Sequence, residues 1–489
     1  MKPPRVLLVA AVIATGCVTT DPRRSFEEVS TTARQRTRLE AAWNRTTEER
    51  AAARAEVRSL LALPLTAESA AQVALINNPG LQAELAVLGI AQADLAQASR
   101  LANPSIDGFV RRPNGDGTGS NHEGGLLFDL LDDLLVPARK RIAAAELERA
   151  KLEVGSALLD TVAGTREAFY RYLASEQLLG RLGKILEIDR AAAEFAGALY
   201  EAGNLGELEL RNAEAMLAQT TVDLGNTRLA VQKDREALNL WMGLWGADLS
   251  WAAGERLPEL PEELPELTGL ERRAVAERLD IAAGRWAVDA VGKALALKKG
   301  TRFFPAGIEI GVSTERDLDG TRVTGPALAL ELPIFDTGKA SIARLEAEYE
   351  RSQRQLERLA IRVRSEVRMA RAELVASTEI AAYTRDVLLP QRVRILELTL
   401  LHYNAMLKGA FDVLLAKQSE VAVERAYIAA WRDAWIAHVH LDRAVGSLVA
   451  GGGAAGHSIT DLPKEVTETT EATEATEATE AEEMHSDHS

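Results

Sequence analysis

The chain has 489 residues and a formal net charge of −15, from 57 Lys and Arg against 72 Asp and Glu. Ten of the acids lie between Asp461 and Ser489 against Lys464 alone, a net −9, so the rest of the chain carries −6. With no basic stripe and a pI near 5.2, nucleic acid is excluded as an expected partner. Aromatic residues make up only 5% while Ala, Leu, Glu and Arg abound, which favours long helices packed through small side chains.

The first residues have the layout of an export signal. Lys2 and Arg5 precede a short apolar run, and small residues lead to Cys17, the only cysteine. The ending Gly16-Cys17 resembles the lipobox of bacterial lipoproteins. We therefore expect residues 1–16 to be a signal peptide and Cys17 to carry lipid; the alternative is a buried, inert cysteine. No later segment reads as a transmembrane helix, because charge interrupts each one.

One pattern occurs twice in the chain. The stretch "ALINNPGL" from Ala74 returns as "AVAERLDI" from Ala274, and "ARKRIAAA" from Ala138 returns as "GKASIARL" from Gly338, each at an offset of 200. The turn "LYEAGNLGELEL" from Leu199 returns as "HYNAMLKGAFDV" at an offset of 203. A spacing this large indicates a duplicated half rather than a short solenoid repeat.

Each half contains a very long helical run. Apolar residues recur at steps of four and seven along Leu147–Leu173 and again along Ile342–Leu374, which is typical of coiled coils. The first run, 138–199, would reach roughly 90 Å. Glycines break the runs at 203–206 and 409, where we expect helical hairpins to turn. Pro390 lies inside the second run and predicts a kink.

A strand hairpin is expected before each long helix. Ile308, Ile310 and Val312 alternate with small or polar residues, and "ALALELPIF" alternates again after the turn "DLDGTR". The first half gives a weaker pair, 106–110 and "GGLLFDLLDDLL". A soluble edge hairpin would also alternate. Short strands flanked by very long helices favour a small barrel spanning an outer membrane.

Four strands cannot close such a barrel, and open strand edges are not tolerated in lipid. Chains must therefore combine. The expected fold is mainly α with a small β-barrel part: three copies form a twelve-stranded outer-membrane barrel continued by a twelve-helix periplasmic tube. We expect an obligate homotrimer.

These features together resemble the TolC-type outer-membrane efflux factor family, particularly its lipid-anchored members. The resemblance spans roughly 66–446 and rests on "NNPGL", "NPSI", "PIFDTGK" and the paired turns. It implies a passive exit duct, for small molecules or metal ions, that spans the outer membrane of a Gram-negative bacterium and extends into the periplasm. It also implies a periplasmic adaptor (membrane fusion) protein and an inner-membrane pump as partners.

The resemblance assigns roles to the two hairpin turns. Tyr200 and Gly203 match the family in the first turn, and Tyr403 and Asp412 match in the second; Met406 departs from a glycine. The implied adaptor-contact residues are Tyr200, Gly203, Gly206, Tyr403 and Gly409. The implied closing residues are Glu209, Tyr403, Lys408 and Asp412, with Glu209 bonded by Lys408 and Tyr403 of a second hairpin. Ordinary solvated turn residues are the alternative interpretation.

The remaining segments divide the chain further. We expect a lipid-anchored segment at 17–65, repeats at 66–250 and 269–447, a Pro- and Glu-rich linker at 251–268 and an acidic disordered tail at 448–489. No cofactor or metal site is expected; Met484, His485 and His488 in the tail are the candidate metal ligands. His438 and His440, two apart on a helix, are interpreted as structural.

The sequence predicts no enzyme, because it lacks a phosphate loop, a metal-spaced cluster and a gathered catalytic set. The rival to a channel is a structural protein, a trimeric coiled-coil lipoprotein that tethers envelope layers without conducting. The paired strand hairpins discriminate between the two, since a tether has no use for a barrel.

Overall fold

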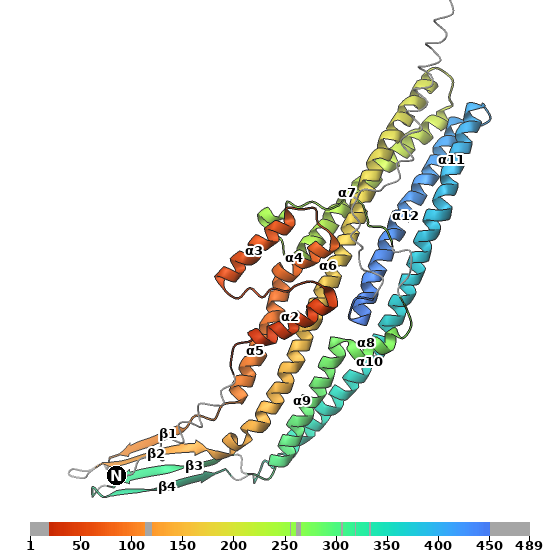
Figure 1. Ribbon diagram of the computed structural model, residues 1–489. Coiled ribbons are helices and arrows are strands. Elements are labelled where there is room, and N and C mark those ends of the chain that lie inside the picture. Colours follow the sequence, from red (N-terminus) through yellow and green to blue (C-terminus); the bar gives the residue numbers. More distant parts are fainter. Residues whose placement is uncertain are drawn as a thin grey trace, which may run out of the picture. The chain divides into compact units, whose positions relative to one another are not determined.

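Helices dominate the described chain, and their order repeats (Figure 1). The computed structural model describes residues 19–112, 120–254, 256–260, 266–304, 307–317, 319–331 and 334–449. These all belong to the first of two units, Met1–Gly451. The predicted lipid anchor Cys17 and the tail residues Met484, His485 and His488 lie outside the described residues.

Each half contains two helices, two strands and a long helical hairpin. The first half consists of α4 (Ala67–Asn77), α5 (Pro79–Ala98), β1 (Ser105–Arg111), β2 (Asn121–Asp129), α6 (Leu130–Glu201) and α7 (Glu207–Met242). The second consists of α8 (Leu270–Glu277), α9 (Leu279–Thr301), β3 (Ile308–Arg316), β4 (Arg322–Leu330), α10 (Lys339–Tyr383), η2 (Thr384–Leu388), α11 (Leu389–Asn404) and α12 (Ala410–Val445). The N-terminal helices α2 (Arg23–Thr37) and α3 (Thr47–Leu61) precede both halves, and the 3₁₀ turn η1 (Gly246–Leu249) follows α7.

The four strands form one antiparallel sheet in the order β1-β2-β3-β4. β2 pairs with β3, with Leu126 opposite Val312, so the sheet joins the two halves. Residues directly opposite each other share a face, and one face gathers the apolar side chains Ile106, Leu126, Phe128, Ile310, Val312, Leu328 and Leu330. The predicted hairpins with one apolar face are present. β1 and β4 each have one edge without a strand partner among the described strands.

The boundary of the first long helix differs from the expectation. The stretch "GGLLFDLLDDLL" was expected to be strand, with helix from Ala138, but β2 ends at Asp129 and α6 begins at Leu130. The Asp129 carboxylate caps the helix by accepting the N–H of Asp132 at 2.8 Å. Pro137 therefore lies inside α6. With 72 residues, α6 extends for about 108 Å at about 1.5 Å per residue.

The expected break near Pro390 takes the form of a π-helical turn. η2 separates α10 from α11, and the Leu389 N–H donates to the carbonyl of Thr384, five residues earlier. Pro390 follows at the start of α11. Because proline lacks an N–H, a wider turn just before it is a local way to interrupt the regular helical ladder.

The "NNPGL" motif joins two helices end to end. Asn78 caps α5 by accepting the N–H of Leu81 at 3.0 Å, and its amide donates to the carbonyl of Trp241 at 2.7 Å. The Asn77 amide donates to the carbonyls of Met242 and Gly243. The two side chains thus satisfy carbonyls left open at the end of α7. Pro79 suits the first position of a helix because its missing N–H is not needed there.

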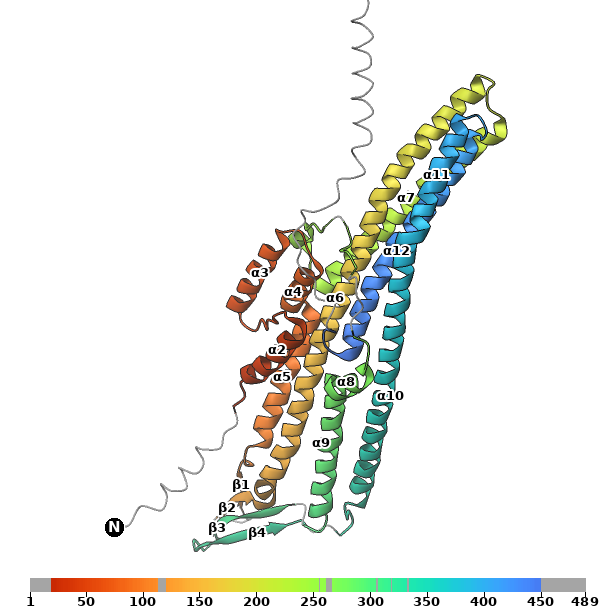
Figure 2. The same cartoon turned by 45° about the vertical axis from the view of Figure 1, so that its right-hand side comes forward.

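Alanine, valine and leucine side chains fill the core where the helices converge. α6 packs against α4, α5, α7, α9 and α12, and α10 packs against α9 and α12 (Figure 2). Ala70, Val73, Leu85, Leu158 and Leu238 are fully buried. The N-terminal segment reaches the second half through Arg36, which donates to the carbonyls of Gly446 and Glu277 at 2.8 and 2.7 Å. These two hydrogen bonds hold the C-terminal end of α2 against the second half of the chain.

No single helix among the described residues combines the length and apolar character needed to cross a membrane. Only α4 and α5 taken together pass that test, and they are bent by 50°.

Candidate functional site

The two hairpin turns are structural copies of each other. In the first, Gly203 has φ 71° and the N–H of Asn204 donates to the carbonyl of Leu199 at 2.8 Å. In the second, Met406 has φ 58° and the N–H of Leu407 donates to the carbonyl of His402 at 2.9 Å. Both bonds span five residues, as in the Schellman motif that ends many helices. Met406 therefore adopts the backbone conformation that Gly203 adopts in the first turn.

Replacing Met406 with glycine is expected to stabilise this turn. A non-glycine residue in the left-handed region costs about 1 kcal/mol, and the Met406 side chain is 93% exposed, so little packing is lost. We expect a gain of about 1 kcal/mol per chain in the local stability of the hairpin. Hydrogen exchange of residues 403–409 measures it: exchange should slow in Met406→Gly. Faster exchange would show that the methionine side chain itself holds the turn.

The predicted closing residues lie at the two hairpin turns, with Lys408 and Asp412 at the second turn and Glu209 near the first. Lys408 Nζ lies 2.9 Å from Asp412 Oδ1, and the N–H of Gly409 donates to Asp412 Oδ2 at 3.0 Å. The Lys408 ammonium and the Gly409 amide keep the pKa of Asp412 below its usual value. Glu209 occupies the corresponding position on α7, with its carboxylate folded over Gly206. Within this chain, Lys408 is thus paired with Asp412.

Glu209 and Tyr403 both line a cavity between the two hairpins. The cavity has a volume of about 190 Å³, and its other lining residues are Ala192, Phe195, Ala196, Leu199, Leu205, Leu400, Ala410, Phe411, Val413 and Leu414. Tyr200 is 42% exposed and Leu407 72% exposed. The predicted bond from Lys408 and Tyr403 to Glu209 stays a prediction, and forming it would require Lys408 to share or leave Asp412.

Ion pairs between the hairpins lie further from the turns. Arg181 of α6 forms a bidentate pair with Glu424 of α12, with Nε donating to Oε2 at 2.6 Å. Arg425 donates to Asp223 of α7 at 2.6 Å. The Arg425 contact keeps the pKa of Asp223 below its usual value. We call these two contacts the inter-hairpin pairs.

The spacing of residues on α12 is a sequence signal for one of the inter-hairpin pairs, although the pair was not predicted. Val421, Glu424 and Ile428 fall at steps of three and four on α12, the spacing of a buried stripe, and Val421 and Ile428 are buried. A charge on such a stripe needs a partner on a neighbouring helix. Glu424 has a side chain only 15% exposed, and Arg181 is that partner.

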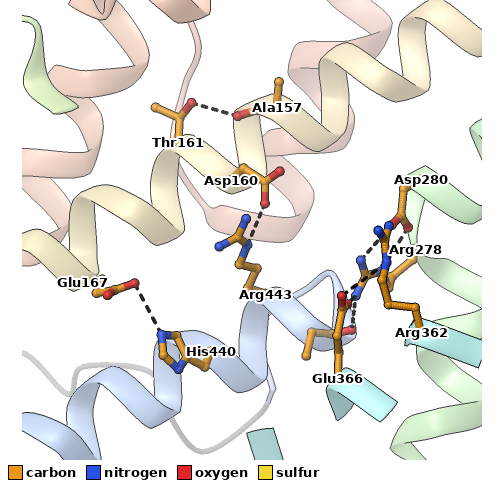
Figure 3. Close-up of polar contacts among 11 residues, drawn as sticks. Ala157, Asp160, Thr161, Glu167, Arg278, Asp280, Arg362, Glu366, His440 and Arg443 are labelled. Carbon is orange, nitrogen blue, oxygen red and sulfur yellow. Dashed lines mark hydrogen bonds and ion pairs between the residues drawn. The ribbon is translucent and has the colours of Figure 1, made fainter. Parts of the chain in front are cut away.

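A second group of charges surrounds a cavity of about 630 Å³ where α6, α9, α10 and α12 meet. Figure 3 shows Arg443 of α12 directed at Asp160 of α6, and Arg278 between Asp280 and Glu366. The distances are 2.8 Å for Arg443 to Asp160 and 2.7 Å for Arg278 to Glu366. The cavity therefore lies within a network of charges that links the two halves.

His438 and His440 lie on different faces of α12, as predicted. His438 is buried near Trp435, and burial lowers its pKa. His440 instead contacts Glu373 and Glu167. Among the residues that the structure describes, no group of three His, Cys, Asp or Glu side chains is arranged to hold a metal ion.

Comparison with known proteins gives one relative along most of the chain. The cobalt-zinc-cadmium resistance protein CzcC of Cupriavidus metallidurans is 22% identical over 394 residues, covering 78% of this chain and 90% of that protein. GMP synthase of Aeropyrum pernix is 32% identical over 117 residues, 24% of this chain and 22% of that enzyme, a span too short to relate their functions. No protein-family model matches the chain.

Solved structures share the fold. A membrane protein from Pseudomonas aeruginosa superposes with a TM-score of 0.67 at 21% identity, covering 80% of this chain and 94% of the other. The CmeC outer membrane channel of Campylobacter jejuni gives 0.66 at 16% identity, covering 79% and 87%. The chain thus has the fold of the CmeC outer membrane channel. The predicted resemblance to the TolC-type outer-membrane efflux factors is confirmed.

Proposed function

We propose that this chain is the outer-membrane channel of a tripartite efflux system, and that three copies form the duct. The observation that carries the proposal is the four-stranded sheet, which has an apolar face, a polar face and two edges without strand partners among the described strands, and which leads directly into α6. Backbone groups at an open edge cost several kcal/mol each in lipid. Pairing β4 of one copy with β1 of the next would satisfy them. A non-conducting tether has no use for such a sheet.

The expected assembly is an obligate homotrimer. The mass of the mature protein purified in mild detergent, measured by light scattering or native mass spectrometry, tests this directly. Three chains per particle are expected. A monomer that retains its strand content by circular dichroism would contradict the closure argument.

In a closed barrel, the apolar face of the sheet would suit the lipid outside, and the opposite face would suit the water inside. Opposite the apolar face, the register gathers the acidic residues Asp107, Glu123, Asp129, Glu309 and Glu315, with Arg111 as the basic residue. In a closed barrel, three copies would line the duct with carboxylates, which attract cations. The name of the relative CzcC, a cobalt-zinc-cadmium resistance protein, also supports metal cations as cargo. We therefore favour metal cations as cargo, and small molecules are the alternative.

The cargo is tested in cells. Deleting the gene should raise the cellular content of zinc, cobalt or cadmium when cells are exposed to that metal, as measured by inductively coupled plasma mass spectrometry. Reintroducing the wild-type gene should return the metal content to its original value. A variant with Asp107, Glu123 and Glu315 changed to their amides should restore export less well. Unchanged metal content with raised accumulation of an organic dye would assign the duct to small molecules instead.

The partners and location follow from the duct. We infer a periplasmic adaptor that contacts the turns at Gly203 and Gly409, an inner-membrane pump, and the outer membrane of a Gram-negative bacterium. We infer that the protein itself makes and breaks no covalent bond, because passage through the duct needs no catalysis.

The lipid on Cys17 is a separate prediction. Thr19 begins the described chain and α2 begins at Arg23, so the anchor would lie a few residues from a helix held along the repeats. Mass spectrometry of the mature N-terminal peptide should find acylated Cys17. An unmodified thiol there, or a mature terminus at another residue, would contradict the prediction.

A further inference from the structure

His440 contacts a carboxylate in each half of the chain. Its Nδ1 lies 3.1 Å from Glu373 Oε2 on α10, and its Nε2 lies 3.4 Å from Glu167 Oε2 on α6. Figure 3 shows the His440 ring facing Glu167 across the gap between α12 and α6. A neutral imidazole has one N–H and would turn a lone pair towards one of the two carboxylates. Only the imidazolium donates to both, so this geometry favours the protonated ring.

The neighbouring charges have their own partners. Asp160 on α6 pairs with Arg443, and Glu366 on α10 pairs with Arg362 and Arg278. Asp280 of α9 pairs with Arg278, and Glu167 also accepts from Arg171 at 2.8 Å. On α12, Asp442 is half-buried and accepts the N–H of Val449. Glu373 has no ion-pair partner other than His440 in the described part of the chain. Loss of the His440 charge would therefore leave Glu373 unpaired.

We propose that Glu167, His440 and Glu373, which we call the His440 cluster, act as a pH-dependent contact that holds α12 against α6 and α10. Protonation tightens the two halves against each other, and loss of the proton loosens them. The proposal rests on the proposed function in one respect: if opening of the duct moves the second hairpin away from the first, acid favours the closed tube and alkali favours opening.

The pH window follows from the sign of the shifts. The contact with Glu167 raises the pKa of His440 above 6.5, and the contact with His440 lowers the pKa of Glu167 to about 2. The stabilisation is therefore complete below pH 6.5 and is lost as the pH rises through the raised value. Burial raises the pKa of Asp442 to about 6 and lowers that of His438 below 6.5. Both groups thus change charge below the window in which His440 does.

The test compares hydrogen exchange in the full trimer at pH 6.5 and two units higher, corrected for the intrinsic effect of pH. Peptides covering 436–441 should open more often at the higher pH, by about tenfold for each unit by which the His440 pKa is raised. His440→Gln, which is never charged, should exchange fast at both values. His440→Arg, which is always charged, should stay protected at both. His402→Gln, a histidine change on exposed α11 away from the cluster, should follow the wild type.

The possible results are distinct. A wild type whose corrected exchange does not change with pH overturns the proposal, and so does a pH effect that His440→Gln retains, since another group would then be titrating. Exchange that follows His440, together with bilayer conductance that does not change with pH, would support the cluster and contradict its link to opening of the duct. No conductance under any condition would contradict the proposed function alone.

Discussion

Removing both inter-hairpin pairs is expected to open the duct. In Glu424→Gln with Asp223→Asn, Arg181 and Arg425 lose their partners on the opposite hairpin. All four side chains keep some solvent exposure, from 15% at Glu424 to 37% at Arg181, so each pair is worth about 1 kcal/mol after screening. Two pairs in each of three chains act on one aperture. Together they bias closure by several kcal/mol, a shift of about a hundredfold or more in the open population.

Single-channel recording of purified protein measures that population. Arg211→Ala is the matched control, because Arg211 is 63% exposed and pairs with Glu207 and Glu214 inside α7 only. It should leave the open population unchanged. Reversing one pair, Arg181→Glu with Glu424→Arg, should restore closure that either single change loses. If the wild type conducts and the double variant opens as rarely as it does, the hairpins are held by other contacts, such as the predicted bond to Glu209.

Gly311→Ala is expected to break the sheet between the two halves. A Cβ built at Gly311 would lie 1.9 Å from the carbonyl oxygen of Leu126 and 2.9 Å from the Cα of Leu127 on β2. Neither backbone atom can move away without separating the strands. The lost hydrogen bonds cost several kcal/mol each in lipid, so we expect the yield of trimer from outer membranes to fall by about tenfold or more.

Gly325→Ala is the control for that change. Gly325 lies on β4, and no atom comes within 4 Å of a Cβ built there. Alanine is favoured over glycine in a strand interior by about 0.5 to 1 kcal/mol, so this variant should assemble as well as the wild type. Size-exclusion chromatography of detergent extracts compares the two. Equal trimer yields for both variants would mean that β2 and β3 do not pair as described.

Local signals predicted most of the fold. Alternation located β3, and "PIFDTGK" located the start of α10, where the N–H of Gly338 donates to Asp336 at 2.8 Å. The first half was predicted less well at one boundary. "LLDDLL" is apolar enough for a strand, and the cap at Asp129 that turns it into helix depends on a single hydrogen bond. The hairpin turns were predicted in position, and at Met406 the backbone kept a shape that glycine usually supplies.

Contacts between the halves could not be predicted in the same way. Arg181 and Glu424 lie 243 residues apart, and Glu167 and His440 lie 273 apart. Which charge meets which depends on how far one long helix slides against another, and sequence periodicity alone does not fix that shift. His440 was therefore interpreted as structural from its spacing to His438, whereas its two carboxylate contacts became visible only in the structure. Glu424, a charged residue on the buried stripe of α12, is the sequence signal that could have predicted a partner on a neighbouring helix.

Conductance of the purified trimer in a planar lipid bilayer distinguishes a continuous duct from a non-conducting tether. The variant Glu424→Gln with Asp223→Asn is the form to record, because a closed wild type could be silent. A continuous duct predicts discrete conductance steps that favour cations over anions, with rare steps in the wild type. A trimer that inserts into the bilayer and gives no steps in either form would contradict the channel and favour the non-conducting tether.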